Sequence, residues 1–476
     1  MAGTYRRCYF YENFFMQAET SLSTKYNVPV PRYTSYPTVP SWKDGIDLPS
    51  WKDSFTRGFT ENNSRDGISR YIHLPFCESL CIYCGCTKRI TTNHSVEEEY
   101  VRAVLQEWDI YRRLMPEPPV IRELHLGGGT PTFFSPANLA RLIEGILKGA
   151  RLHPQYGFSL EGHPNSTRKD HLQVLSDLGF RRISYGVQDL NIEVQRLIHR
   201  IQPFEHVQKA TEVARETGFS SVNFDLIYGL PGQDQEKLIR SINRSLTLHP
   251  DRVAFYSYAH IPQVSCNQRL IDERNLPSAL EKLDLYHKGR EIFLQQGYTD
   301  IGMDHFTLRT DELYKAGQAG QLHRNFMGYT VQKSGLLLGL GLSAISDTGG
   351  AYAQNSKSLT EYYRAVATGT PAVRKSYFLG EEDKVFRRHI LDIACHGQTM
   401  LDPAWSTLLD EWTIPQLREL EKDGLVSLNG NEIKLTERGK PFLRHVCKAF
   451  DLHLLRGERA RGDSGGLCKP AFASSI

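Results

Sequence analysis

From residue 70 to about residue 345, short apolar runs alternate with longer stretches whose apolar residues recur at the spacing of a helix face. Short apolar runs bounded by turn residues indicate buried strands, and the helical spacing indicates amphipathic helices. The predicted strands span 71–74, 121–126, 158–161, 182–187, 222–228 and 253–258. The predicted helices span 95–114, 169–178, 205–217, 235–248 and 279–296, and a further helix begins at 135–136. This alternation predicts a mainly parallel α/β sheet with right-handed crossovers.

About six βα units fit into this region, fewer than the eight of a closed barrel. The predicted fold is therefore an open, partial TIM-like (β/α)6 barrel, with a buried apolar, glycine-rich strand within 336–346 near the site. Two of the helix starts have local signals. Ser95 and Glu98 have the spacing of a capping box, and Pro136 takes the first helical position, where proline is tolerated.

The barrel region, predicted to span 69–375, is preceded by an N-terminal arm spanning 1–68. Residues 31–38 (PRYTSYPT) combine two prolines with alternating aromatics, which favours an extended strap. Residues 1–15 lack the continuous apolar core and the cleavage site of a signal peptide. We expect Met16 to be an alternative start, so that 1–15 is not native, with a short helix at 16–25.

The region 376–456 is predicted to form a mostly α, winged-helix-like lid domain. Helices at 384–394, 413–423 and 436–450 accompany a hairpin with the turn Asn429-Gly430. DNA binding is the obvious alternative for such a unit. However, the helix at 413–423 has three acidic residues beside two basic ones and no basic face, which argues against a nucleic-acid partner. Residues 457–476 are rich in Arg, Gly and Ser and are predicted to be disordered.

The composition is that of an ordinary globular protein. The 476 residues are 40% hydrophobic and 23% charged, with a formal net charge of +3. No apolar run is long enough to span a bilayer, and the near-neutral charge gives no reason to expect a nucleic-acid or membrane partner. The nine cysteines are an odd number and no signal peptide accompanies them, which indicates free thiols and a cytoplasmic location.

Four of the nine cysteines lie between residues 77 and 86, directly after the first predicted strand. Cys77, Cys81 and Cys84 have the spacing C-x3-C-x2-C, and Cys86 follows. Three thiolates on one loop suit three irons of a [4Fe–4S] cluster, whose fourth iron is then open to another ligand. A zinc site completed by Cys86 or His73 is the alternative, although the spacing is unusual for zinc. Buried cysteines without a ligand would not explain the clustering.

Glycine and polar residues recur where successive predicted strands end. The second strand ends in Gly127-Gly-Gly-Thr130, and Glu161, Gln188 and Asp225 lie at or near the ends of the next three. Each alone is typical of a tight turn, a helix cap or a solvated position, and the glycine spacing is not a dinucleotide fingerprint. Their recurrence at the carboxyl ends of parallel strands predicts one common site.

The cysteine motif after a first strand resembles that of the radical S-adenosylmethionine (SAM) enzymes. The extension to Cys86, the strap 31–38 and the runs 302–306 (GMDHF) and 323–329 (HRNFMGY) resemble one branch, the oxygen-independent coproporphyrinogen III oxidases. The resemblance covers residues 31 to about 455. It implies an open (β/α)6 barrel that binds a [4Fe–4S] cluster and SAM, and a monomer that takes electrons from a reduced flavodoxin- or ferredoxin-type donor.

The resemblance also implies roles for single residues. Cys77, Cys81 and Cys84 are expected to bind the cluster, while Cys86 and His73 are expected to be catalytic without binding iron. The expected SAM contacts are Tyr71, Tyr83, Gly128, Gly129, Thr130, Glu161, Gln188, Arg200, Asp225, Ala259 and Ile345. Substrate propionates are expected at Arg32, His305 and Arg324. Two departures from the family pattern are Tyr83, often Phe, and His163, which we leave without a role.

The implied reaction converts two propionates of coproporphyrinogen III into vinyl groups, giving protoporphyrinogen IX and consuming two SAM. SAM is cleaved to methionine and a 5′-deoxyadenosyl radical, which removes a β-hydrogen before carbon dioxide and one electron leave. Three alternatives stay open. A sister enzyme would open the haem ring, a haem chaperone would bind haem without decarboxylation, and an iron–sulfur regulator would bind DNA through its terminal domain in a salt-dependent manner.

Overall fold

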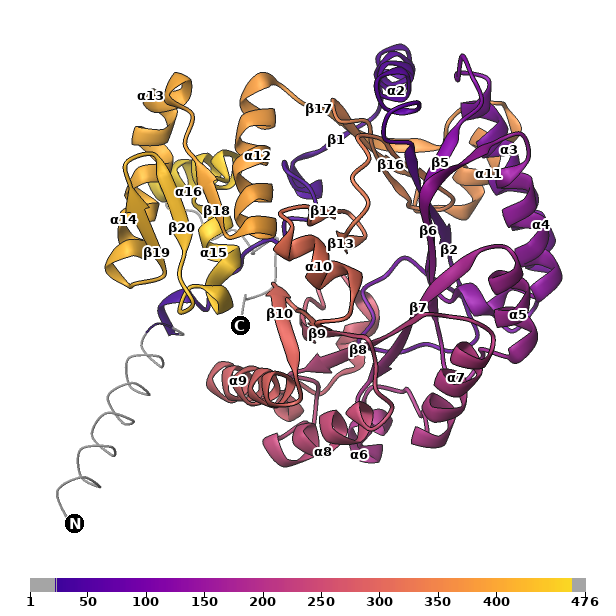
Figure 1. Cartoon of the computed structure of the whole chain (residues 1–476), viewed down its shortest axis with the longest axis horizontal. Helices are drawn as coiled ribbons and strands as arrows, with labels where there is room; N and C mark the ends of the chain where they lie inside the picture. The colour runs from indigo at the N-terminus through magenta and orange to yellow at the C-terminus, as the bar shows by residue number, and fades with distance from the viewer. Residues whose placement is uncertain (1–21, 23, 465–476) are drawn as a thin grey trace.

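The computed structural model describes Leu22 and residues 24–464 and is built around a 13-stranded sheet. Six parallel strands lie side by side in chain order (Figure 1). They are β2 (Ile68–Leu74), β5 (Val120–Gly128), β6 (Arg151–Gly162), β7 (Phe180–Gln188), β8 (Ser221–Tyr228) and β9 (Arg252–Ser257). These correspond to the six predicted strands, so the predicted βα core is confirmed.

Further strands extend the sheet at both ends. β14 (Leu337–Leu340) lies parallel beside β2, followed by antiparallel β15 (Ile345–Asp347), β16 (Ala351–Asn355), β17 (Val373–Phe378) and β1 (Lys43–Asp44). Beyond β9 come antiparallel β11 (His305–Leu308) and β10 (Tyr298–Gly302). Because β1 and β10 are the two ends of the order, the barrel stays open within the described residues.

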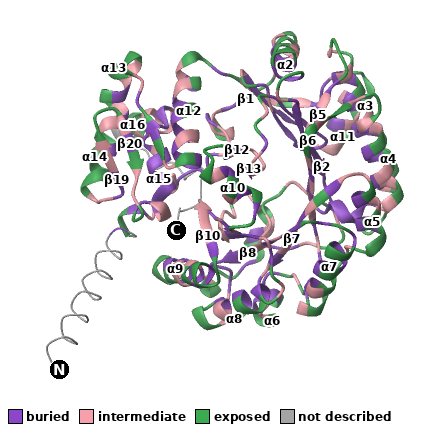
Figure 2. Cartoon of the chain, in the orientation of Figure 1, coloured by how far each residue is buried: buried purple, intermediate pink, exposed green. Residues whose placement is uncertain are grey.

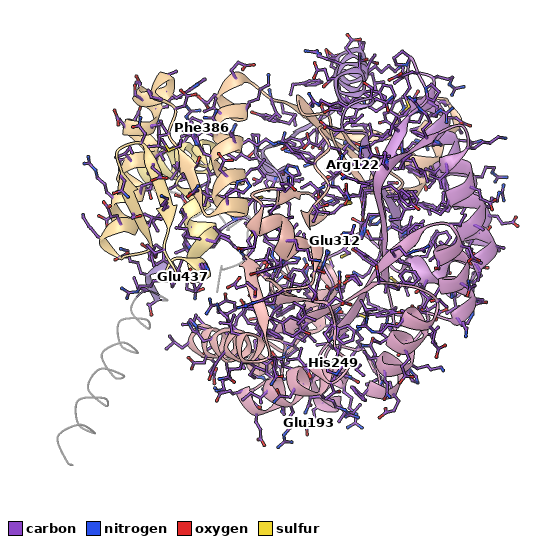
Figure 3. All side chains as sticks on the ribbon, in the orientation of Figure 1. Arg122, Glu193, His249, Glu312, Phe386 and Glu437 are labelled. Atoms are coloured by element: carbon purple, nitrogen blue, oxygen red, sulfur yellow. The ribbon has the colours of Figure 1, made fainter. Side chains whose placement is uncertain are left out.

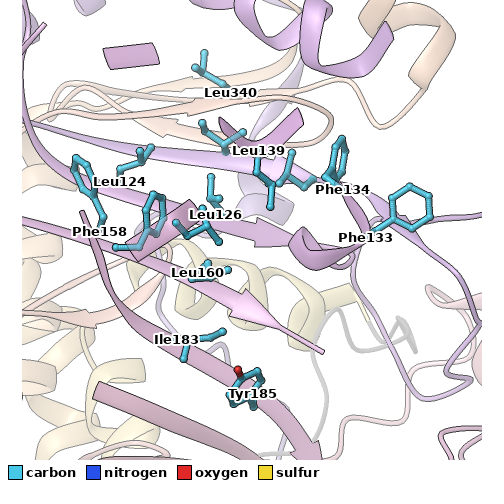
Figure 4. Packing of buried hydrophobic residues seen from close by; sticks show 14 of the residues in the cluster. Leu124, Leu126, Phe133, Phe134, Leu139, Phe158, Leu160, Ile183, Tyr185 and Leu340 are labelled. Atoms are coloured by element: carbon cyan, nitrogen blue, oxygen red, sulfur yellow. The ribbon is translucent and has the colours of Figure 1, made fainter. Parts of the chain in front are cut away.

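Helices cover the outer face of the parallel strands, with exposed outer sides over a buried sheet (Figure 2). They are α3 (Val96–Arg112), α4 (Pro136–Leu147), α5 (Lys169–Asp177), α6 (Ile192–Leu197), α7 (Phe204–Glu216), α8 (Gln235–Leu246) and α9 (Ala279–Gln295). Between the layers Leu124 and Leu126 of β5 pack with Leu139 of α4, and Leu160 and Ile183 continue the row (Figure 4). Each such side chain contributes about 1.5–3 kcal/mol through burial.

The predicted capping box at Ser95 is wrong. Ser95 already has helical backbone angles, and its side chain makes no capping hydrogen bond. Instead the Glu97 amide donates to His94 O at 3.1 Å. The Glu97 carboxylate accepts from Ser135 N and Asn138 Nδ2, both at 2.8 Å, and so links the starts of α3 and α4. A tertiary contact has replaced the local one.

A second unit follows the barrel, and its core also includes side chains from the N-terminal segment and the barrel region, such as Tyr33, Leu283 and Tyr329. It contains α12 (Glu381–His396), β18 (Gln398–Met400), α13 (Ser406–Leu408), α14 (Ile414–Lys422), β19 (Val426–Asn429), β20 (Glu432–Leu435), α15 (Leu443–Lys448) and α16 (Leu452–Ser464). Its three strands have the order β18-β20-β19, and Gly430 in the predicted turn has φ +61°. Figure 3 places Phe386 and Glu437 in this C-terminal unit, apart from Arg122 in the barrel.

The disorder predicted for 457–476 is wrong up to Ser464, because α16 continues through it. Ion pairs hold this helix to the rest of the unit, among them Arg456 Nη1–Glu382 Oε1 at 2.6 Å and Arg459 Nη1–Glu411 Oε1 at 3.0 Å. Charges that suggested a solvated tail are therefore used in contacts with earlier helices. Residues 465–476 lie outside the described part of the chain.

The N-terminal segment connects the C-terminal unit to the barrel. Tyr33 Oη donates to Asp451 Oδ2 at 3.1 Å, and Trp42 stacks on Tyr352 of β16 with ring centroids 5.0 Å apart. The segment also contributes β1 and α2 (Leu48–Asn62), so the predicted arm is partly barrel structure. Leu22 and residues 24–26 are helical, while the rest of the predicted 16–25 helix and 1–15 lie outside the described residues. None of the described helices has the length and apolar character needed to cross a bilayer.

Candidate functional site

The cysteine loop leaves the sheet at the carboxyl end of β2. Its ends are fixed by a short parallel pair, β3 (Phe76–Cys77) and β4 (Arg89–Ile90). Cys77, Cys81, Cys84 and Cys86 all line one cavity of about 420 Å³. That volume lies in the range of cofactor pockets. The loop therefore presents its thiols together at the end of the sheet where the sequence predicted a site.

Polar groups surround the sulfurs. Thr130 Oγ1 donates to Cys77 Sγ at 3.3 Å, and Arg200 Nη1 lies 3.5 Å from Cys81 Sγ. A hydrogen bond from Cys86 lowers the pKa of Cys84 to about 6, while burial raises the pKa of Cys77 to about 11. Donors of this kind stabilise sulfur that carries negative charge, as a thiolate bound to iron does.

A second loop holds the cysteine loop from outside, and sequence reasoning missed it. Asn267 Nδ2 donates to Ile82 O at 2.7 Å, and Gln268 Nε2 donates to Tyr83 O at 2.8 Å and to Ala259 O at 3.1 Å. These amides follow β9 in a 3-10 turn, Cys266–Leu270. A single Asn-Gln pair in a loop gives no signal in the sequence that it will reach a segment about 185 residues earlier.

The glycines at the end of β5 pack too closely against the cysteine loop for a side chain to fit. A Cβ on Gly129 would lie 2.6 Å from Pro75 O and 3.0 Å from Cys77 Sγ. Gly128 has φ +125°, a conformation that other residues rarely adopt. The backbone can therefore approach a ligand closely beside the cysteines, which distinguishes this segment from an ordinary tight turn.

Two carboxylates face the cavity from the next strands. Glu161 Oε2 accepts a hydrogen bond from Gly128 N at 3.1 Å, and Asp225 Oδ1 accepts one from Ser184 Oγ at 3.1 Å. Burial, and then the nearby Glu161 charge, raise the pKa of Asp225 to about 7. Arg200 donates to Gly186 O at 2.6 Å, so its guanidinium is fixed opposite these acids. Acids on one side and a cation on the other suit a zwitterionic ligand with hydroxyl groups.

Most of the predicted SAM contacts come together in this cavity. Those that line it are Tyr83, Gly128, Gly129, Thr130, Glu161, Gln188, Arg200 and Asp225. Three do not. Tyr71 packs behind the glycines, its ring 2.9 Å from where a Cβ on Gly127 would lie. Ala259 offers its carbonyl to Gln268, and the Ile345 side chain packs in a cluster with Trp42 and Tyr352.

His73 is buried just outside the lining, and both its ring nitrogens have partners. Nε2 is 2.8 Å from Thr87 O and must donate to it, so Nδ1 accepts from Tyr71 Oη at 3.0 Å. Burial lowers the pKa of His73, which is therefore neutral. These contacts connect β2 to the return of the cysteine loop, and the catalytic role of His73 stays a prediction. Cys86 lines the cavity together with Cys84, and its catalytic role stays a prediction as well.

A smaller cavity of about 130 Å³ continues into the barrel interior. Glu161, Ser184, Asp225 and Tyr256 line both cavities. The inner one also reaches His305, one of the predicted propionate contacts. The other two lie close by: the Arg32 guanidinium is 4.8 Å from the Tyr256 ring centroid, and Arg324 Nη2 donates to Arg32 O at 3.3 Å.

The donor set fits a cluster better than a single ion. In the described residues, no three His, Cys, Asp or Glu side chains converge as ligands of one metal ion, which the zinc alternative requires. Three thiols spread around a shared cavity are what a polynuclear centre needs, since each binds a different iron. Cys77, Cys81 and Cys84 would hold it, and Gly128, Gly129 and Glu161 line the same cavity.

Known proteins agree with this reading of the geometry. Residues 71–244 match the Radical SAM superfamily. The oxygen-independent coproporphyrinogen III oxidase of Helicobacter pylori is 36% identical over 452 residues, which cover 92% of this chain and 97% of that protein. The Escherichia coli protein of the same name is 37% identical over 447 residues, covering 93% and 96%. The solved structure of the E. coli coproporphyrinogen III oxidase (HemN), a radical SAM enzyme, superposes with a TM-score of 0.83 at 36% identity, covering 89% of this chain and 97% of that one.

Proposed function

Since this chain belongs to the oxygen-independent coproporphyrinogen III oxidases of the radical SAM superfamily, we propose that it converts two propionates of coproporphyrinogen III into vinyl groups. The product is protoporphyrinogen IX, a late intermediate of haem biosynthesis. The observation that carries the proposal is the cavity lined by the three cysteines, Gly128, Gly129, Glu161 and Asp225. It lies in a chain that matches its relatives over nearly their whole length.

When bound, the cluster and SAM supply the one-electron chemistry by which a propionate loses a hydrogen atom, carbon dioxide and an electron. The protein must orient both partners and exclude water. Gly128 and Gly129 give a ligand access to backbone groups, and Glu161 keeps the Gly128 amide in place. We assign Arg200 to the SAM carboxylate, and Asp225 to its ribose hydroxyls.

His73 and Cys86 act on the loop rather than on the substrate. His73 links Tyr71 of β2 to Thr87, so it fixes the return of the loop to the sheet. Cys86 hydrogen bonds to Cys84, so it tunes one cluster ligand without binding iron. We further propose that the enzyme is a cytoplasmic monomer that receives electrons from a reduced flavodoxin- or ferredoxin-type protein.

One anaerobic assay tests the function. The protein is reconstituted with iron and sulfide and mixed with coproporphyrinogen III, SAM and a reductant. We expect 5′-deoxyadenosine and protoporphyrinogen IX in a ratio of about two to one, because each propionate consumes one SAM. A parallel reaction receives haem in place of coproporphyrinogen III. A linear tetrapyrrole from haem would identify a ring-opening enzyme instead, and haem binding without decarboxylation of coproporphyrinogen III would identify a chaperone.

A further inference from the structure

Two guanidinium groups pair with one buried carboxylate, Asp304, and a third, that of Arg324, lies near enough to influence its charge. Arg444 Nη2 of α15 is 3.0 Å from Asp304 Oδ1, and Arg32 Nη1 is 3.8 Å from Asp304 Oδ2. Burial opposes the charge on Asp304, but Arg444, Arg32 and Arg324 outweigh it and hold the pKa of that carboxyl below its usual value. Within residues 24–464, Arg324 forms no ion pair, and Arg32 and Arg444 form theirs with Asp304 alone.

Several donors in this cluster have no acceptor. Arg324 is 5% exposed, and its Nε and Nη1 are buried without a hydrogen-bond partner; the same is true of His305 Nδ1. An unpaired buried cation is costly, so such groups are expected to meet an anion in some state of the protein. The cluster contains three guanidiniums for one carboxylate, so it has two positive charges in excess.

Of these donors His305 lines the inner cavity, and the two arginines contact aromatic side chains that line it. The Arg324 guanidinium lies 4.7 Å from the Tyr329 ring centroid, and the His305 ring contacts Tyr329 and Tyr256 edge-on at 5.4 and 5.9 Å. His305 and Tyr329 line the inner cavity, and Tyr256 lines both. The Arg32 side chain lies against Tyr256 and is 37% accessible, so its guanidinium is open to an anion.

We propose that Arg32, Arg324 and His305 form a carboxylate subsite for the two propionates of the tetrapyrrole that are not converted. The inference rests on the proposed function, because it presumes a tetracarboxylate substrate. The propionate that reacts must lie at the cofactor cavity, which these donors do not line. Two uncompensated guanidiniums match the two carboxylates that remain in the product. The same subsite would hold the substrate while it turns to present its second propionate.

Binding of two stable metal-free porphyrins tests the subsite on the reconstituted holoenzyme. Coproporphyrin III carries all four propionates, whereas mesoporphyrin IX carries only the two that survive the reaction. Arg324→Gln should weaken the binding of both porphyrins by a similar factor of about ten or more, because it removes a charge-assisted hydrogen bond. Arg32→Gln should do the same. Arg240→Gln, an exposed arginine of α8, is the matched control and should change neither.

Removal of the negative charge, rather than of a positive one, distinguishes an effect on porphyrin binding from an effect on folding. Asp304→Asn removes the carboxylate that competes for these guanidiniums, so it should tighten porphyrin binding while Arg324→Gln weakens it. Equal weakening by both would indicate a merely structural role and would overturn the proposal. So would weakening of coproporphyrin alone, which would place the reacting propionate here, or unchanged binding in both arginine variants. Failure of the proposed function would look different: the wild-type protein would yield no protoporphyrinogen IX.

Discussion

Charged groups are buried in two regions of the molecule, and the regions are built in different ways. At the cofactor cavity, Glu161, Arg200 and Asp225 come from consecutive βα units, and each has a partner from a neighbouring strand or loop. At the junction with the C-terminal unit, Asp304 joins Arg32 and Arg444, which are far apart in the chain. The first region depends on a repeated local unit, and the second depends on the whole chain having folded.

The difference predicts that damage to one region leaves the other intact. Loss of cofactor groups should abolish chemistry in a stable protein. Loss of junction groups should loosen the contact between barrel and C-terminal unit in a protein that still carries its cluster. The following changes test this separation, from the largest expected effect to the smallest.

Removal of a cluster thiol should have the largest effect. Cys77→Ser should abolish iron binding and activity, because a serine hydroxyl is a poor ligand for the cluster. Iron and sulfide content after anaerobic reconstitution measures the result. Cys395→Ser is the matched control, since Cys395 is a buried cysteine of α12 outside the cavity. A Cys77 variant with full iron content would show that the wrong thiols have been assigned.

Cys86→Ser should keep the cluster and lose most turnover. Cys86 lies on the cavity and hydrogen bonds to Cys84, so its loss should alter the electronic environment of that ligand rather than its presence. Iron content compared with 5′-deoxyadenosine formation separates the two effects. A Cys86 variant that has lost its iron would make Cys86 a ligand and contradict the assignment.

Asp225→Asn should weaken SAM binding by about ten- to a hundredfold, the value of one or two strong hydrogen bonds. The cluster should remain, because Asp225 contacts no cysteine. Equilibrium binding of SAM to the reconstituted protein measures the change. Asp234→Asn, at the exposed start of α8, is the control and should bind SAM normally. Normal affinity in Asp225→Asn would remove this residue from the SAM site.

Arg444→Met should destabilise the junction by about 3 kcal/mol, because it leaves Asp304 buried with one partner fewer. The thermal unfolding midpoint and the hydrogen exchange of α15 should report the change, while iron content stays normal. Arg456→Met breaks a half-exposed ion pair in the same unit and should cost less than about 1 kcal/mol. Equal effects of both variants would contradict a special role for the buried junction.

The smallest expected effect is on the pH dependence of folding stability and concerns Glu107, a buried carboxyl of α3. Burial raises the pKa of Glu107 to about 7, although its carboxylate accepts from Gly341 N, Asn355 Nδ2 and Tyr362 Oη. In the unfolded chain a glutamate titrates near pH 4.3. Between these values the folded protein holds a proton that the unfolded chain has released, so folding stability falls as the pH rises.

Glu107→Gln removes this titration. The stability of the wild type relative to the variant should therefore decrease by about 1–3 kcal/mol between pH 5 and pH 8. Chemical denaturation at the two pH values measures it. Parallel pH dependence in the two proteins would show that Glu107 is ionised throughout.

The contrast between the two regions also explains what the sequence could predict. Apolar runs mark buried strands, so five of the six parallel strands are predicted to within about three residues, whereas β6 begins at Arg151, well before the predicted 158–161. The cavity is predictable because the carboxyl ends of parallel strands meet. The capping box at Ser95 failed because Glu97 is used by the next helix. The predicted disorder of 457–464 is wrong because charges in this stretch have partners on other helices, such as Glu411 for Arg459, which the local sequence does not reveal.

The prediction of the site is limited in the same way, because contacts between distant parts of the chain are not visible in the sequence. Tyr71, Ala259 and Ile345 were placed by resemblance, and their side chains do not line the cavity. Asn267 and Gln268 hold the cysteine loop but have no motif. Arg32, His305 and Arg324 were expected to contact substrate, but their arrangement around Asp304 depends on contacts across the chain that no local pattern reveals.

The central claim is that three sulfurs hold a [4Fe–4S] cluster with one iron open to SAM. Electron paramagnetic resonance of the reduced, anaerobically reconstituted protein, with and without SAM, tests it most directly. We predict a cluster signal whose g-values change when SAM is added, and which Cys77→Ser abolishes. A signal that SAM leaves unchanged, or a protein that holds zinc in place of iron, would contradict the account.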